Sequence, residues 1–261
     1  MSTILDKILA DKLLEVAKLK EQFSADSYQK TTGFLKPRIS LKHSIESKGL
    51  GIIAEIKKRS PSKGELRPDL DVEELAKTYS VAGAAGLSIL TDEKYFGGNA
   101  LDLIAGRNVS PLPILRKDFI IDEIQLYQTR SIGADVVLLI AAALDPIKLK
   151  LLSRKARELE LEVLLEVHSL EELQSHLTPD ATLVGVNNRD LKTFSVDINR
   201  SEELAEYIPE DFTKITESGL SSSAQVLRLA KVGYKGFLIG ESFLVAQDPG
   251  AACKKLLMEL K

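Results

Sequence analysis

The chain has 261 residues, 44% of them hydrophobic, and a formal net charge of −3. This length suits one domain with a large core, and the near-neutral charge gives no reason to expect binding to nucleic acid or to an anionic membrane. Cys253, the one cysteine, cannot form an internal disulfide, no apolar run reaches the ~20 residues that span a bilayer, and the start lacks a signal-peptide pattern. We therefore expect a soluble, cytoplasmic protein.

The first element in chain order is an amphipathic helix. Ser2 or Thr3 is a suitable N-cap, with Asp6 in the first turn. The apolar face of this helix must be buried, so residues 1–49 are predicted to form a helical extension packed on the following domain. Packing is the simpler role, and covering the rim of a pocket is the alternative. The residues at helical spacing are Ile4, Leu5, Ile8, Leu9, Leu13, Val16, Leu19 and Phe23.

From residue 50 onward, short apolar or β-branched runs alternate with helical patterns. Strands alternating with helices indicate parallel βαβ units, and eight units fit a (β/α)₈ TIM barrel, which typically has ~250 residues. A doubly wound sheet is the main alternative, but no Gly-x-Gly-x-x-Gly turn follows the first strand. We predict a single α/β domain with its barrel over residues 50–261. The predicted strands are 50–57, 86–91, 112–117, 135–140, 162–167, 183–187, 213–217 and 236–240, and the predicted helices are 72–82, 123–132, 146–159, 170–176, 202–208 and 222–232.

Polar groups recur where these strands end. Glu55 and Lys57 lie two residues apart in the first strand and therefore share a face; a structural ion pair is one interpretation and a functional pair is the other. The carboxyl ends of barrel strands converge on the rim that carries the active site. Because two lysines and three glutamates reach this rim from four strands, we favour an active site. The later strand ends carry Lys117, Glu166, Asn187, Glu217 and Gly240.

Alternation along residues 113–117 places Lys117 on the face opposite Arg116. A lysine at the inner rim can act as a general acid, a Schiff-base nucleophile or an anion ligand. Its ordinary pKa is ~10.4, so a proton-donor role gains if Lys57 or burial lowers that value. Glu166 is the strongest carboxylate for acid–base chemistry, with a simple ion pair to Lys117 or Lys57 as the alternative.

Two glycines indicate a phosphate site after the last two strands. Gly219 precedes three serines that suit a helix start, and Gly240 follows the last strand. Barrel enzymes often hold phosphate there on backbone N–H groups, and a side chain would keep the anion away. Because Glu241 carries a negative charge, we expect its side chain to point away from this site.

Six motifs in register resemble those of the indole-3-glycerol-phosphate synthases, from the amino-terminal helix to the last strand. They are residues 53–64 (IAEIKKRSPSKG), 90–98 (LTDEKYFGG), 115–120 (LRKDFI), 165–168 (LEVH), 185–191 (GVNNRDL) and 217–219 (ESG).

This resemblance implies a (β/α)₈ carboxy-lyase of tryptophan biosynthesis that uses no cofactor. The implied substrate is 1-(2-carboxyphenylamino)-1-deoxyribulose 5-phosphate, and the products are indole-3-glycerol phosphate, carbon dioxide and water. Lys117 is the implied general acid of ring closure, and the later acid–base steps fall to Glu166 and Lys57.

The resemblance also implies roles for the rest of the site. Glu55 and Asn187 would bind the substrate hydroxyls and keep the lysines in place. Ser60 would grip the anthranilate carboxylate together with Lys57, and Arg189 would be structural or would organise the carboxylates of the rim. The remaining binding residues are Phe96 and Phe119 at the aromatic ring, Glu217 and Ser218 at the ribulose, and Gly219 and Gly240 at the phosphate.

Two other kinds of function are compatible with this fold and phosphate site. A sugar-phosphate isomerase or a Schiff-base aldolase using Lys117 would share the fold and the phosphate site, and a non-catalytic phosphometabolite-binding barrel is a third possibility.

The scattered histidines, His43, His168 and His176, give no metal-ligand spacing. We expect a phosphorylated small molecule as the partner, no metal, no nucleic acid, no membrane, and a monomer or weak homodimer.

Overall fold

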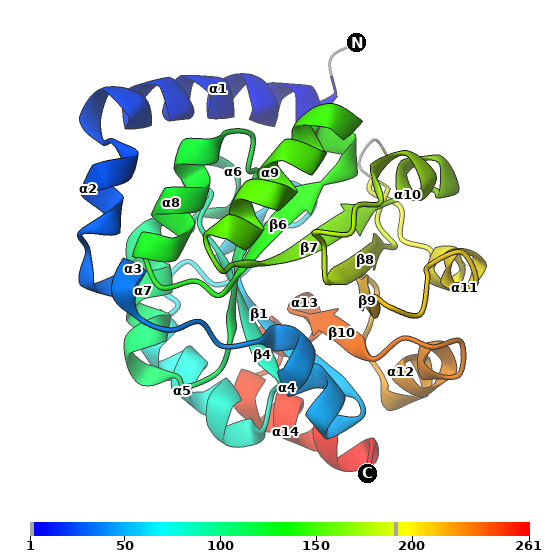
Figure 1. The fold of residues 1–261 in the computed structure, drawn as a ribbon. Helices are drawn as coiled ribbons and strands as arrows, with labels where there is room; N and C mark the ends of the chain where they lie inside the picture. The colour runs from blue at the N-terminus through cyan, green and yellow to red at the C-terminus, as the bar shows by residue number, and fades with distance from the viewer. Residues whose placement is uncertain (1–2, 191–192) are drawn as a thin grey trace.

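Eight parallel strands close into a barrel in the computed structural model, which describes residues 3–190 and 193–261 (Figure 1). The strands follow chain order around the barrel, and β1 pairs with both β4 and β10. All eight predicted strands are confirmed, each within two residues at either end. They are β1 (Gly51–Ile56), β4 (Gly86–Leu90), β5 (Ile114–Lys117), β6 (Val136–Ile140), β7 (Glu162–Val167), β8 (Leu183–Asn187), β9 (Thr213–Glu217) and β10 (Gly236–Ile239). A short hairpin, β2 (Arg59–Ser60) and β3 (Gly64–Glu65), lies in the loop after β1.

Helices cover the outside of the barrel. The predicted amino-terminal helix is α1 (Ile4–Gln22), whose N-cap Thr3 forms a capping box with Asp6; Ser2 and Leu191 lie outside the described residues. The other predicted helices correspond to α5 (Val72–Ala82), α8 (Glu123–Ser131), α9 (Pro146–Glu158), α10 (Leu170–His176), α11 (Asn199–Ala205) and α12 (Ser223–Ala230). The pattern did not predict α2 (Ala25–Gln29), α3 (Thr32–Leu35), α4 (Leu41–Lys48), α6 (Glu93–Phe96), α7 (Ala100–Val109), a 3₁₀ turn (Ala141–Ala143), α13 (Glu241–Leu244) and α14 (Pro249–Glu259).

One predicted helix start was wrong by three residues, and another was off by one. Helix α11 begins at residue 199 rather than 202. In its first turn, the N–H and the Oγ of Ser201 both donate to Oδ1 of Asn188, at 3.2 and 2.7 Å. This partner lies on the loop after β8, so helical periodicity alone does not reveal it. In α12, Ser222 is the N-cap and its side chain accepts from the N–H of Gln225.

The barrel interior changes from apolar to charged along its axis. Helix α4 closes the amino-terminal end, where Leu41 and Ile45 are fully buried and pack with the inward residues Ile53 and Ile215. A second apolar cluster lies between the strands and the outer helices. The strands are thus held from both faces, which fixes the side chains at their carboxyl ends.

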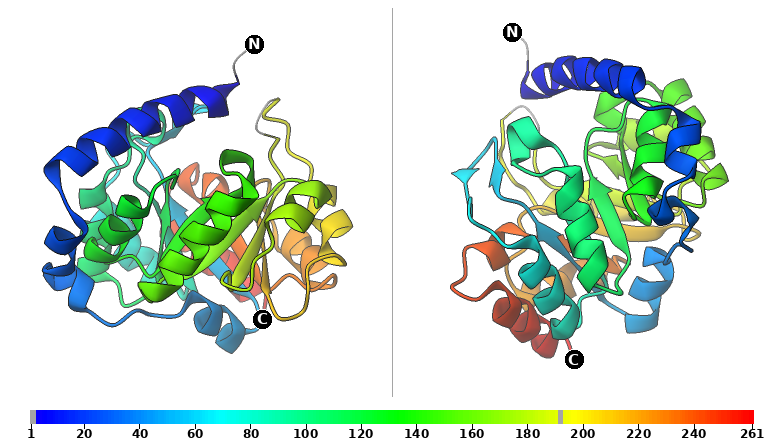
Figure 2. Two further views of the ribbon diagram at one scale, coloured as in Figure 1. Left: turned by 45° about the horizontal axis from the view of Figure 1, so that its top comes forward. Right: turned by 90° about the vertical axis from the view of Figure 1, so that its left-hand side faces the viewer.

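Helix α1 lies across the opposite end of the barrel, the end from which the loop after β8 projects (Figure 2). Its predicted apolar stripe is only partly buried: Ile8 and Val16 are buried, whereas Leu13 is 59% exposed and Phe23 is 44% exposed. Lys12 is buried instead, because its ammonium pairs with Asp92 and Asp118 beneath the helix. Among the described residues, no helix combines the length and apolar character needed to cross a membrane.

Candidate active site

The carboxyl ends of the strands surround a cavity of about 840 Å³. Each of the eight strands contributes at least one side chain to the lining, and the first turns of α1 cover part of it through Ile4, Leu5 and Ile8. The structure brings every residue predicted for the site together around this cavity. These residues are Glu55, Lys57, Ser60, Phe96, Lys117, Phe119, Glu166, Asn187, Arg189, Glu217, Ser218, Gly219 and Gly240.

Lys117 lies between two buried carboxylates at the centre of the cavity. Its Nζ is 2.8 Å from Oε2 of Glu166 and 2.9 Å from Oε2 of Glu217. Both glutamates are only 2% exposed, and they come from β7 and β9. The alternation predicted for β5 is confirmed, since Lys117 points inward while Arg116 points outward and binds Thr91 and Asp118.

One ammonium between two carboxylates sets the protonation of this group. Burial alone would lower the pKa of Lys117, but Glu166, Glu217 and Glu55 outweigh it and raise the pKa above its ordinary value. Burial likewise opposes ionisation of Glu166, yet Lys117 and His168 lower its pKa to about 2. Burial and the neighbouring charge of Glu166 raise the pKa of Glu217 to about 8. At neutral pH the group therefore holds an ammonium, a carboxylate and a mostly protonated carboxyl.

The raised pKa of Lys117 is opposite to the shift that the proton-donor role was expected to need. The donor is fully protonated before substrate binds, and the neutral amine that a Schiff base requires is disfavoured. This argues against the aldolase alternative.

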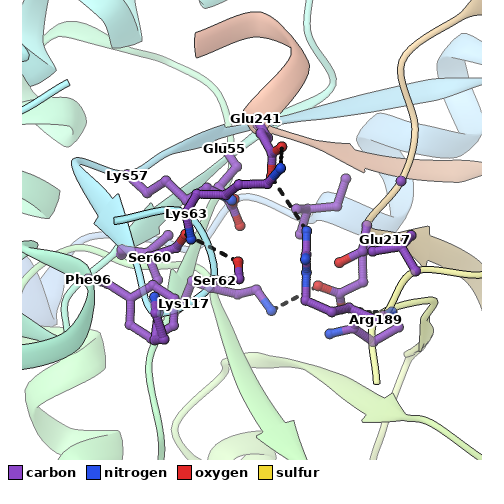
Figure 3. A pocket seen from close by; sticks show the side chains of 18 of the residues that line it. Glu55, Lys57, Ser60, Ser62, Lys63, Phe96, Lys117, Arg189, Glu217 and Glu241 are labelled. Atoms are coloured by element: carbon purple, nitrogen blue, oxygen red, sulfur yellow. Dashed lines mark hydrogen bonds and ion pairs between the residues drawn. The ribbon is translucent and has the colours of Figure 1, made fainter. Parts of the chain in front are cut away.

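Glu55 and Lys57 form the predicted pair on β1 and the residues just after it. Nζ of Lys57 is 2.5 Å from Oε1 of Glu55. Asn187 contacts a carboxylate rather than a lysine, because its Nδ2 donates to Oε1 of Glu166 at 3.2 Å. In Figure 3, Lys57 and Ser60 lie across the cavity from Arg189 and Glu217.

One wall of the cavity is apolar and aromatic. The rings of Phe96 and Phe119 lie 6.2 Å apart between centroids and are inclined by 40°. Sequence reasoning missed Leu138 and Ile140, which also line the cavity from β6. Their even spacing in a predicted strand is the signal that could have identified them as inward residues. This wall suits a flat aromatic group.

The loops after β9 and β10 leave backbone groups exposed to the cavity. Ser218 and Gly219 have φ angles of 69° and 79°, a left-handed conformation that turns successive N–H groups to one side. Helix α13 begins after Gly240 without a side-chain cap, so its first N–H groups lack intrahelical partners. Ser242, which sequence reasoning missed, lines the cavity and has a buried Oγ without a hydrogen-bond partner. An anion is the ligand that satisfies such donors.

Ion pairs cross the mouth of the cavity. Oε1 of Glu241 is 3.5 Å from Nζ of Lys63, and its Oε2 is 3.4 Å from Nη2 of Arg189. The expectation that the Glu241 side chain points away was wrong, because these two cations draw it over the mouth (Figure 3). Sequence reasoning did not assign Lys63 to the site, although it lies in the basic loop after the first strand.

Fold and site together define a (β/α)₈-barrel enzyme with acid–base groups at its carboxyl rim. In the described ranges, no group of three His, Cys, Asp or Glu side chains suits a metal ion. The family model for indole-3-glycerol phosphate synthase matches residues 5–256. The chain belongs to the indole-3-glycerol phosphate synthase family.

Individual relatives agree with this assignment. An indole-3-glycerol phosphate synthase of Bacteroides thetaiotaomicron is 45% identical over 261 residues, covering 100% of both chains. One of Laribacter hongkongensis is 44% identical and covers 98% of this chain and 99% of its own length. Among solved structures, 3-hexulose-6-phosphate synthase from Salmonella typhimurium superposes with a TM-score of 0.62 at 14% identity, covering 81% of this chain and 98% of that chain. This last likeness concerns the fold alone.

Proposed function

We propose that the cavity converts 1-(2-carboxyphenylamino)-1-deoxyribulose 5-phosphate to indole-3-glycerol phosphate, carbon dioxide and water. The observation that carries this proposal is the position of Lys117, a buried ammonium held between Glu166 and Glu217. An aromatic wall and an anion-binding turn line the same cavity. The substrate has the matching parts: an anthranilate ring, a carbonyl group and a phosphate.

Lys117 is the general acid of ring closure. The aromatic carbon that bears the carboxylate attacks the C2′ carbonyl carbon, and Lys117 donates its proton to the oxygen as negative charge develops there. Glu217 supports this role, since its raised pKa keeps a second proton near Nζ. Loss of carbon dioxide then restores the aromatic ring.

The C2′ hydroxyl leaves with the help of one acid and one base. We assign these roles to Lys57 and Glu166. The low pKa of Glu166 keeps this carboxylate ionised and able to accept a proton, so we assign it as the base and the ammonium of Lys57 as the acid. Glu55 accepts a hydrogen bond from Lys57, and Asn187 donates one to Glu166. Glu55 and Asn187 also form hydrogen bonds with the substrate hydroxyls.

Binding divides between the two ends of the substrate. Gly219 and Gly240 bring backbone N–H groups to the phosphate, and Glu217 and Ser218 line the ribulose. Phe96 and Phe119 pack on the ring, whose carboxylate contacts Ser60 and Lys57. Arg189 organises the mouth through Glu241.

The proposal also covers the domain organisation, the location and the partners of the enzyme. Residues 1–49 form a helical extension packed on the barrel, with the first turns of α1 over the rim, and residues 50–261 form the barrel. The enzyme acts in the cytoplasm on a small phosphorylated substrate, as a monomer or weak homodimer. It needs no cofactor, and it binds neither nucleic acid nor membrane.

A fluorescence assay tests the activity. The chain contains no Trp, so indole emission can be followed against a low background after substrate is added without metal or cofactor. We expect steady product formation that Lys117→Ala abolishes and that Lys254→Ala, an exposed lysine on α14, leaves unchanged. Absence of product from the folded wild-type chain would falsify the proposal.

A further inference from the structure

A buried imidazole lies directly behind Glu166. Nε2 of His168 is 3.5 Å from Oε1 of Glu166, and Nδ1 is 3.3 Å from Oε2 of Glu172 on α10. The His168 side chain is 10% exposed. It follows β7 directly but contributes no surface to the cavity lining, so it reaches the reaction only through Glu166.

The start of α10 holds Glu172 beneath the ring. Ser169 is the N-cap and its Oγ accepts from the N–H of Glu172 at 3.1 Å. Glu172 sits at the third helical position, but its Oε2 accepts from the backbone N–H of His168 at 2.7 Å rather than from the N-cap. The same oxygen faces Nδ1, so the backbone and the ring of His168 are fixed by one carboxylate.

The other ring nitrogen needs an explanation. Nε2 is buried and has no hydrogen-bond partner within ordinary geometry, and an unsatisfied buried polar group destabilises the fold. The acceptor that faces Nε2 is Oε1 of Glu166. An unprotonated Nε2 would turn a lone pair toward this carboxylate, whereas an imidazolium would turn an N–H toward it.

The charges around the ring favour the imidazolium. Glu166 on β7, Glu172 on α10 and Glu217 on β9 all face it. Burial lowers the pKa of His168, but these carboxylates outweigh burial and raise it above the ordinary value. Lys117 binds the other oxygen of the same carboxylate, with Nζ 2.8 Å from Oε2 of Glu166.

We propose that His168, held by Glu172, is a positioning residue that keeps Glu166 ionised and directs its carboxylate into the cavity. This inference rests on the proposed function, in which Glu166 is the base of the dehydration step. Glu166 is then held from two sides: Lys117 binds Oε2, and His168 lies against Oε1.

Three substitutions separate charge from shape. His168→Gln retains an amide N–H that can reach Glu166 but removes the charge, His168→Ala removes both, and Glu172→Gln retains an acceptor for Nδ1. His176→Ala is the matched control, since His176 lies on the same helix as Glu172 but contacts the hydroxyl of Ser175 and the backbone carbonyls of Glu172 and Leu144 rather than a carboxylate.

The first readout is the pH profile of kcat, per folded protein. Removing a cation within ~4 Å of a carboxylate raises the pKa of that carboxylate by ~1 unit or more. We therefore expect His168→Ala to move the acidic limb of the profile to higher pH and to change KM less than about twofold. Because Glu166 stays ionised at neutral pH after such a shift, we expect kcat at neutral pH to fall about tenfold for a different reason: the carboxylate is no longer held in place. His168→Gln should recover part of kcat but not the position of the limb, and Glu172→Gln should move the limb in the same direction.

The outcomes distinguish this inference from the proposed function. If the wild-type chain makes no product, the proposed function fails. If the wild type is active but His168→Ala retains kcat and its acidic limb within the spread of His176→Ala, the positioning role is overturned.

A second readout does not depend on activity. In the folded, ligand-free chain, the ¹³Cε1 resonance of His168, assigned by its absence in His168→Gln, should titrate above the ordinary pKa of ~6.5. It should move toward that value in Glu172→Gln. A neutral imidazole at pH 6.5 would overturn the inference even if every variant lost stability.

Discussion

Two buried lysines sit in similar surroundings at different places in the molecule. Nζ of Lys12 lies 3.0 Å from carboxylate oxygens of both Asp92 and Asp118, beneath α1. Nζ of Lys117 lies at almost the same distances from Glu166 and Glu217, but inside the cavity. Each lysine thus joins two buried carboxylates from different strands or strand ends, and Lys12 also pairs with the exposed Glu15 at 2.6 Å.

The two clusters differ in charge balance. Beneath α1 a second cation is present, because Nη2 of Arg116 is 2.9 Å from Oδ2 of Asp118. Burial opposes ionisation of Asp118, yet Arg116 and Lys12 outweigh it and lower its pKa to about 2. At the rim, His168 faces Glu166, but Lys117 is the one cation that lowers the pKa of Glu217, and burial and Glu166 raise that pKa to about 8.

This difference distinguishes a structural cluster from a reactive one. A balanced buried cluster has no reason to exchange protons near neutral pH. An unbalanced one holds a proton that is easily moved, which is what an acid–base site requires. Substitutions that remove a charge should therefore affect folding in one cluster and turnover in the other.

The largest effect is expected for Lys12→Met. Removing one partner of a buried ion pair leaves uncompensated charge and costs about 3–5 kcal/mol, so the free energy of unfolding should fall by about that much in a urea titration. Lys20→Met is the control on the same helix, since Lys20 is 53% exposed and pairs with Asp122; an exposed pair is worth at most ~1 kcal/mol. Equal losses in both variants would contradict a structural role for the buried cluster.

Lys117→Ala should affect turnover more than stability, the opposite of Lys12→Met. We expect kcat to fall at least ~10²-fold, the scale of a lost general acid, because the proposed mechanism gives the protonation of the carbonyl oxygen to Lys117. Unfolding should be less affected than in Lys12→Met, since one of the two remaining carboxyls is already mostly protonated. Steady-state kinetics and urea titration on the same preparation check both parts, and a change confined to KM would rule out the acid role.

Glu217→Gln sharpens the comparison through pH. The folded-state pKa of Glu217, about 8, lies above its ordinary value of 4.5, so this carboxyl stabilises the fold at low pH and loses that contribution as the pH rises through about 8. Relative to Glu217→Gln, the free energy of unfolding of the wild type should therefore decline between about pH 4.5 and pH 8. Parallel curves for the two proteins across this range would contradict the raised pKa.

The barrel could be predicted because each of its strands is recognisable from a short stretch of sequence. Each strand is a short apolar or β-branched run, and the parallel arrangement follows from the alternation with helices. The burial of Lys12 could not be predicted in this way. Its partners Asp92 and Asp118 lie about 80 and 106 residues along the chain, and the helical pattern favoured Leu13, which is exposed instead.

The membership of the site could also be predicted, but its electrostatics could not. Strand ends in a barrel converge, so Glu55, Lys117 and Glu166 were expected at one rim. The protonation of Glu217 depends on distances between side chains of three different strands, and the sequence does not contain these distances. The position of Glu241 likewise depends on Lys63 and Arg189 meeting it across the mouth.

The smallest effect is expected at the anion-binding turn, for Gly219→Ala. The φ angle of Gly219 is 79°, and an added Cβ would lie 2.4 Å from Cγ1 of Val196. We expect the strained turn to relax away from this conformation and to withdraw its N–H groups from the phosphate. A hydrogen bond to a charged group is worth about 1.5–3 kcal/mol, and we expect KM to rise about tenfold or more with kcat largely retained.

Gly233→Ala separates this binding effect from backbone strain. Gly233 has a φ of 99°, and an added Cβ would approach only the flexible side chain of Lys214, at 3.4 Å or more. Because Gly233 lies outside the cavity lining, its substitution should lower stability through the left-handed conformation and leave KM unchanged. If both variants raise KM equally, strain rather than a lost phosphate contact explains the effect, and Gly219 has no place in the binding site.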